Sequence, residues 1–116
     1  MKRICIFLVY CFFISCVKDQ PKIRIVNNSG MAYDSIHIFA LEYKKTVFKN
    51  IKPGDKMEGV IVFDDKNTGD GCYKLLLFKN EDLIKNECFG YYTNGKSLDR
   101  KFNITIETDT IKIVPN

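Results

Sequence analysis

Two cysteines in the main part of the chain, Cys72 and Cys88, are the first residues able to do chemistry. Redox-active pairs are usually spaced as Cys-x-x-Cys, whereas these two lie sixteen residues apart. In an oxidising compartment such a pair favours a structural disulfide, and a hairpin with a three-residue loop at Lys79–Glu81 places the two cysteines opposite each other. We therefore predict a Cys72–Cys88 disulfide worth about 3 kcal/mol in the chain-entropy model. Two separately buried thiols are the alternative.

His37 is the only histidine, and it lies between Ile36 and Ile38 in an alternating segment. Acid–base catalysis by histidine requires a partner that orients the ring. No sequence-local residue orients the ring of His37, so a catalytic role requires help from a more distant carboxylate, such as Asp34 or a Glu on a neighbouring strand. The chain also contains no glycine-rich phosphate loop and no nucleophile elbow. We therefore predict a packing role for His37 and no enzymatic activity.

Oxygen-bearing side chains are concentrated at residues 64–71, which read Asp-Asp-Lys-Asn-Thr-Gly-Asp-Gly. A calcium loop uses alternating oxygen ligands around a glycine turn. Counted from Asp65, the sixth position is Asp70 instead of Gly, and the twelfth is Leu76 instead of Glu. We therefore predict a polar hairpin loop with no metal and no other cofactor.

Aromatic residues are concentrated beside a turn signal in Phe89-Gly90-Tyr91-Tyr92-Thr93-Asn94-Gly95-Lys96. Asn-Gly is a strong signal for a two-residue hairpin turn. An exposed ring next to amide donors can stack on a sugar or grip a peptide, although alternating rings can also fill a core. Because neighbouring strand residues face opposite ways, we expect Tyr91 and Tyr92 to point to opposite faces. Tyr91, Tyr92 and Asn94 form the candidate binding patch.

The first fifteen residues have the order of an export signal. Lys2 and Arg3 precede eleven apolar residues, Ile4–Ile14, and small Ser15 comes before Cys16. A membrane-spanning helix needs about twenty apolar residues, so a permanent span is disfavoured. A buried N-terminal strand or helix is the other alternative, but Ile4–Ile14 shows neither polar alternation nor helix capping.

Phe13-Ile14-Ser15-Cys16 resembles the lipobox of bacterial lipoprotein signal peptides, with Phe13 in place of the usual leucine. The resemblance implies cleavage before Cys16 and acylation of its sulfur and its nitrogen. Two or three acyl chains give a stable anchor. The resemblance therefore implies that the membrane is a partner through Cys16.

Residues 17–20, which follow Cys16, read Val-Lys-Asp-Gln. In this class an Asp directly after the cysteine signals retention at the inner membrane, and Val17 occupies that position here. Lys18 and Asp19 resemble in part the export signal of Bacteroidota-type envelope lipoproteins. The resemblance implies lipid anchoring in the outer membrane, on its periplasmic or its cell-surface face. A solvated tether with no sorting role is the alternative.

From Lys22 onward, short runs rich in Ile, Val, Phe and Tyr alternate with clusters of Asn, Gly, Asp and Pro, as in a chain of β-strands. Only Asn80–Glu87 is compatible with one helical turn. The predicted strands are Lys22–Asn27, Tyr33–Ala40, Lys45–Ile51, Lys56–Asp64, Cys72–Phe78, Leu83–Tyr92, Lys101–Glu107 and Thr110–Val114.

The last two of these strands show the clearest period of two. A two-residue turn at Thr108-Asp109 places Ile106 opposite Ile111 and Ile104 opposite Ile113, so that the isoleucines share one face. Eight short strands in one small domain predict an all-β fold, a two-sheet antiparallel sandwich with immunoglobulin-like topology. A small β-barrel is the alternative.

Length and charge limit the remaining possibilities. The chain has 116 residues. We divide it into a signal peptide (1–15), a lipidated cysteine with a short tether (16–21) and a single domain (22–116). Without Lys2 and Arg3, sixteen basic and fourteen acidic residues leave a net charge of +2, which does not indicate a nucleic-acid partner.

The sequence therefore favours a lipid-anchored envelope module that binds a protein, peptide or glycan. The second hypothesis is an inhibitor or immunity protein, whose acidic loop at residues 64–70 faces a basic site on a toxin or host enzyme.

Overall fold

The computed structural model describes residues 20–63, 69–94 and 96–116, and in these residues it contains strands and no helix. The strands are β1 (Lys22–Asn27), β2 (Tyr33–Phe39), β3 (Thr46–Ile51), β4 (Lys56–Val60), β5 (Gly71–Lys79), β6 (Asp82–Thr93), β7 (Lys96–Ser97), β8 (Lys101–Ile106) and β9 (Ile111–Pro115). Eight of the nine match the predicted strands to within a few residues, and short β7 is additional.

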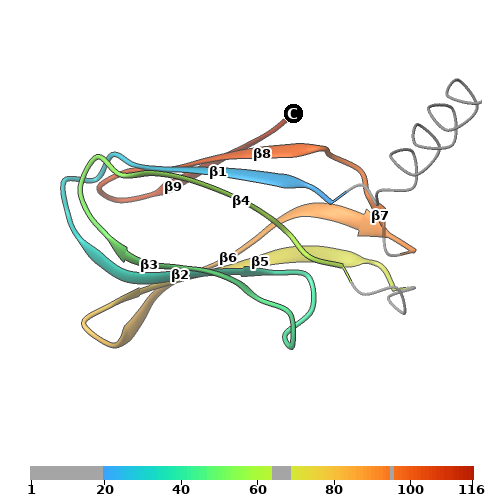
Figure 1. Ribbon diagram of the computed structural model, residues 1–116, viewed down its shortest axis with the longest axis horizontal. Helices are drawn as coiled ribbons and strands as arrows, with labels where there is room; N and C mark the ends of the chain where they lie inside the picture. Colours follow the sequence, from blue (N-terminus) through green and yellow to red (C-terminus); the bar gives the residue numbers. More distant parts are fainter. Residues whose placement is uncertain (1–19, 64–68, 95) are drawn as a thin grey trace, which may run out of the picture.

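The strands form two sheets that pack face to face as a sandwich. One sheet has the order β4-β1-β8-β9, and the other has the order β3-β2-β5-β6-β7. Figure 1 shows the two sheets as two layers, with β6 and β7 rising toward the four-stranded sheet at one end. The predicted all-β sandwich is therefore confirmed, and the five-stranded sheet curls at this end.

Two features of the strand order differ from the expected antiparallel, immunoglobulin-like arrangement. β1 lies between β4 and β8 as one of the two inner strands of its sheet, and it pairs in parallel with β8. In immunoglobulin domains the first two strands share a sheet, whereas β1 and β2 lie in different sheets here.

β4 and β5 also lie in different sheets. The segment between them therefore crosses the sandwich, and the prediction of a hairpin loop there is wrong. Residues 64–68 of this segment lie outside the described residues.

The core lies between the sheets and follows the alternation of the strands. Phe102, Ile104 and Ile106 of β8 face the same side as Ile23 and Ile25 of β1, and all five are almost fully buried. Ile106 pairs with Ile111, and Ile104 pairs with Ile113, which confirms the predicted C-terminal hairpin.

The domain is closed at its N-terminal end by Pro21, which is buried and whose carbonyl accepts a hydrogen bond from Ile61 N (2.9 Å). This bond anchors the chain directly before β1. It also directs the residues after β4 toward the core, where Ile61 and Phe63 are buried. The predicted strand Lys56–Asp64 accordingly ends at Val60.

A buried amide fixes the turn between β1 and β2. Asn27 Nδ2 donates to the carbonyl oxygens of Met31 (2.7 Å) and Lys52 (3.1 Å), and Ser29 Oγ donates to Asn27 Oδ1 (2.7 Å). All polar atoms of this side chain are therefore paired, as a buried amide requires.

Candidate functional site

The aromatic turn predicted from the sequence is present between β6 and β7. Thr93 pairs with Lys96 across it, and Asn94 has a positive φ of 50°, as expected for Asn in a tight hairpin. The backbone N–H of Asn94 donates to Asp70 Oδ1 (3.0 Å). This bond ties the turn to the segment that leads into β5.

The two tyrosines point in opposite directions, as the alternation predicted. Tyr92 is 8% exposed, and its ring lies 5.4 Å from the Phe63 ring and 5.3 Å from the Tyr73 ring. Its hydroxyl donates to the Ala40 carbonyl oxygen (3.5 Å). Tyr91 is 47% exposed. Of the two rings, only Tyr91 is available to a partner.

A β-bulge at Gly90 produces this arrangement. Tyr73 pairs with Phe89, whereas Gly71 pairs with Tyr92, so β6 contains one extra residue at this point. Gly90 has φ +64°, and a Cβ there would lie 2.7 Å from the Phe102 ring and 2.9 Å from the Tyr73 ring. Only glycine fits this position, and the bulge lets Phe89 and Tyr92 both face the core.

Cys72 and Cys88 are joined by a disulfide, with a Cα–Cα distance of 5.8 Å. The predicted geometry is wrong in two details, the length of the turn and the register of the two cysteines. The turn is a two-residue turn at Asn80 and Glu81, both with positive φ, instead of a three-residue loop. A second bulge beyond Leu77 shifts the register, and Cys88 therefore pairs with Lys74. The disulfide runs diagonally across the outer side of the sheet, since Cys88 is exposed and Cys72 is half-buried.

The same outer side carries apolar side chains that do not pack against the core. We call this surface the apolar face and define it by Val47, Leu76, Phe78, Leu83 and Tyr91. His37 of β2 pairs with both Val47 and Leu76, and Phe78 pairs with Leu83, so the first four come from neighbouring positions on β3, β5 and β6. Leu83 is 49% exposed and Val47 is 39% exposed. Apart from Tyr91, sequence reasoning missed these residues, although they occupy the outward positions of the predicted strands.

His37 lies within the apolar face as a packing residue. Its ring centroid is 4.8 Å from that of Phe78, and Nε2 is 3.2 Å from Ser35 Oγ. Nδ1 is buried and has no hydrogen-bond partner among the described residues. Burial lowers the pKa of His37, and the positive charges of Lys45 and Lys49 lower it further. This environment favours a neutral ring.

The remaining predicted site residues belong to the acidic loop at residues 64–71 and to the lipobox at Cys16. Asp70 is exposed and accepts the Asn94 bond, while Asp65 lies outside the described residues. Within residues 20–63, 69–94 and 96–116, no group of three or more His, Cys, Asp or Glu side chains is arranged to hold a metal ion. The same part of the chain contains no helix long and apolar enough to cross a membrane. Cys16 also lies outside the described residues.

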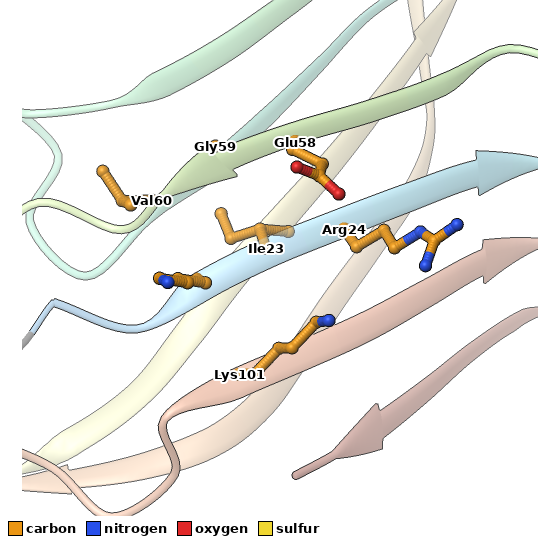
Figure 2. Close-up of a pocket in the computed structure, with 7 residues that line it drawn as sticks. Ile23, Arg24, Glu58, Gly59, Val60 and Lys101 are labelled. Carbon is orange, nitrogen blue, oxygen red and sulfur yellow. The ribbon is translucent and has the colours of Figure 1, made fainter.

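The opposite surface of the molecule, on the four-stranded sheet, contains a hollow of about 430 Å³. Lys22, Arg24, Glu58 and Lys101 contribute charged groups to its lining, together with Val60. Figure 2 shows that the Glu58, Arg24 and Lys101 side chains project from three neighbouring strands, β4, β1 and β8. Three cations and one carboxylate make this hollow electropositive.

Together these features define a small disulfide-bonded β-sandwich with one apolar and one cationic outer face. No family model matches the sequence, and no curated protein matches it. The fold is similar to that of an NMR structure of a protein from Eubacterium rectale. The TM-score is 0.48 and the identity is 14%, over 84% of this chain and 89% of the other.

Proposed function

We propose that this protein is a lipid-anchored module of the bacterial outer membrane that binds a protein or peptide partner through the apolar face. The observation that carries the proposal is the contiguous set of outward apolar side chains on β3, β5 and β6 around His37 of β2. Exposed Tyr91 lies further along β6 on the same side of the sheet. Contiguous exposed apolar surface typically marks an interaction site.

The chemistry of the apolar face favours a protein or peptide over a glycan. Four of its five defining side chains are aliphatic or phenyl groups, which desolvate against apolar side chains of a partner. Tyr91 adds a ring with a polar hydroxyl, the type of residue that often dominates interface energy. The disulfide at Cys88 and the bulge at Gly90 fix the backbone directly before this ring, so binding costs little ordering of the chain.

The partner can be trapped in cells through a photo-crosslinking amino acid in place of Tyr91. We expect a discrete adduct from this position and none from Val114, an exposed apolar residue on the other sheet. Tyr91→Ala should then weaken binding of the trapped partner about thirtyfold, the effect of a typical 2 kcal/mol hot spot.

The same substitution should leave the urea midpoint nearly unchanged, because Tyr91 lies outside the core. Tyr92→Ala is the matched control and should destabilise the domain by about 3–5 kcal/mol. Equal adducts at positions 91 and 114, or a large loss of stability from both tyrosine variants, would overturn the role of the apolar face.

The anchor part of the proposal rests on the lipobox resemblance at Cys16. Cys16→Ser removes the sulfur that is acylated, so the variant should incorporate no labelled fatty acid and should lose the diacyl modification. If the variant still takes up label as the original protein does, the lipoprotein assignment is wrong.

A further inference from the structure

The outer face of the four-stranded sheet carries a strong excess of positive charge. Alternation places Ile23, Ile25, Met57, Phe102 and Ile104 toward the core, so the residues between them face outward. At these outward positions the charged residues are Lys22, Arg24, Lys56, Lys101 and Lys112, with Glu58 as the one carboxylate. We call this surface the cationic face.

The cations of this face are free to meet an external charge. Arg24 pairs with Glu58 in the sheet register, and Lys22 pairs with Lys101. Among the described residues, however, no ion pair or hydrogen bond neutralises the Lys22, Arg24 or Lys101 side chain. The exposed apolar residues Val60 and Val114 lie on the same face.

The cationic face begins where the tether ends. Pro21 is held by its bond to Ile61, and Lys22 is the first residue of β1. Cys16 and Pro21 are five positions apart in the sequence, and such a segment spans at most about 18 Å when fully extended. If Cys16 is acylated, the hollow lined by Lys22 and Lys101 cannot lie far from the lipid headgroups.

We propose that the cationic face docks on the anionic, phosphate-bearing lipid surface in which the anchor is inserted. This inference rests on the proposed lipid anchor. Each Lys or Arg brought close to an anionic lipid surface favours the docked state about fivefold. The two sheets present opposite faces of the sandwich. Docking by the cationic face therefore turns the apolar face away from the membrane, toward a partner.

Reconstitution of the full acylated protein into vesicles tests this orientation. One set contains phosphatidylcholine alone, and the other also contains phosphatidylglycerol. An amine-reactive ester followed by mass spectrometry then reports the accessibility of each lysine. We expect Lys22 and Lys101 to react at least about fivefold more slowly in the anionic vesicles, because headgroups cover them. Lys49 and Lys74, on the opposite sheet, are internal controls whose rates should not change.

Charge-reversal variants and added salt show whether electrostatic attraction causes any protection of the lysines from labelling. Arg24→Glu should restore labelling of Lys22 and Lys101, whereas the matched reversal Lys49→Glu should leave their protection intact. Salt at about 0.5 M shortens the screening length to about 4 Å and should also restore labelling. Circular dichroism of both variants verifies the fold.

Three outcomes would overturn the inference. The first is flotation of the protein with both vesicle types and equal labelling in both. The second is protection that is insensitive to salt and to Arg24→Glu. The third is protection in intact cells but not in anionic vesicles, which would indicate an acidic macromolecule instead of lipid. Failure to float with either vesicle type would instead contradict the anchor itself.

Discussion

The two outer faces of this sandwich differ in chemistry and in how their strands are paired. The cationic face lies on a sheet whose three pairings run without a register shift. The apolar face lies on a sheet with two bulges between β5 and β6, and a disulfide joins the same two strands. The regular sheet presents the charges that simple alternation predicts, whereas the bulged sheet presents apolar groups at altered positions.

This difference indicates that the bulged sheet is the one specialised for contact with a partner. Bulges re-aim side chains and often occur next to functional sites. Here the Gly90 bulge separates outward Tyr91 from the core rings, and the bulge beyond Leu77 places Phe78 opposite Leu83. Both bulges thus determine which apolar groups the five-stranded sheet exposes.

The largest expected effect comes from replacing the glycine of the β6 bulge, which orients Tyr91 outward. In Gly90→Ala the new Cβ must displace the Phe102 and Tyr73 rings while the backbone keeps φ +64°. A left-handed non-glycine residue costs about 1–2 kcal/mol, and overpacking adds about 1–3 kcal/mol. We expect a loss of about 4 kcal/mol in the free energy of unfolding, measured by urea denaturation.

Gly54→Ala is the matched control. Gly54 has φ +85°, but nothing lies within 4 Å of a Cβ there. It should therefore cost only the backbone term of about 1–2 kcal/mol. Equal losses from the two variants would show that close packing does not require glycine in the β6 bulge.

Most of the fold could be predicted from the sequence because apolar and polar residues alternate clearly in strands whose pairings with their neighbouring strands show no register shift. Ile104 and Ile106 of β8 and their partners on β9 are the best example. Strand order could not be predicted, since the parallel contact between β1 and β8 joins segments far apart in the chain. The loss of direct pairing between Cys72 and Cys88 depends on the length of the β5–β6 turn and on a bulge that no local signal marks.

The candidate site was predictable only in part. The opposite orientations of Tyr91 and Tyr92 followed from alternation, and the structure confirms them. The apolar face required the lateral order of β3, β2, β5 and β6, because its side chains are contributed by separate strands. The cationic face likewise required the placement of β1 between β4 and β8.

Removal of the disulfide, which joins β5 and β6 of the bulged sheet, is a second test of the difference between the two sheets. It closes a loop of sixteen residues around the β5–β6 turn, and a loop of this length contributes about 3 kcal/mol by the chain-entropy model. The double variant Cys72→Ala, Cys88→Ala should lose about this amount, measured as a lower urea midpoint. Reduction of the original protein should give the same loss. A reduced protein that unfolds at the oxidised midpoint would contradict a stabilising bridge.

The smallest expected effect concerns Tyr73, whose ring lies in the core beneath the bulged sheet. Its hydroxyl has no hydrogen-bond partner among the described residues. The nearby Ser97 side chain lowers the pKa of Tyr73, but by less than burial raises it. Burial raises the pKa of Tyr73 from 10.0 to about 12. Tyr73→Phe removes an unpaired buried polar group and should stabilise the domain at neutral pH by about 1 kcal/mol.

The pH dependence provides an independent measurement of the same effect. Between pH 10 and about 12 the unfolded chain releases the Tyr73 proton, whereas the folded chain retains it. The unfolded state then binds fewer protons, so the free energy of unfolding falls as the pH rises through this range. Tyr73→Phe lacks this loss, and its advantage over the original protein should widen above pH 10. A difference between Tyr73→Phe and the original protein that stays constant across this pH range would show that the Tyr73 hydroxyl ionises equally in both states.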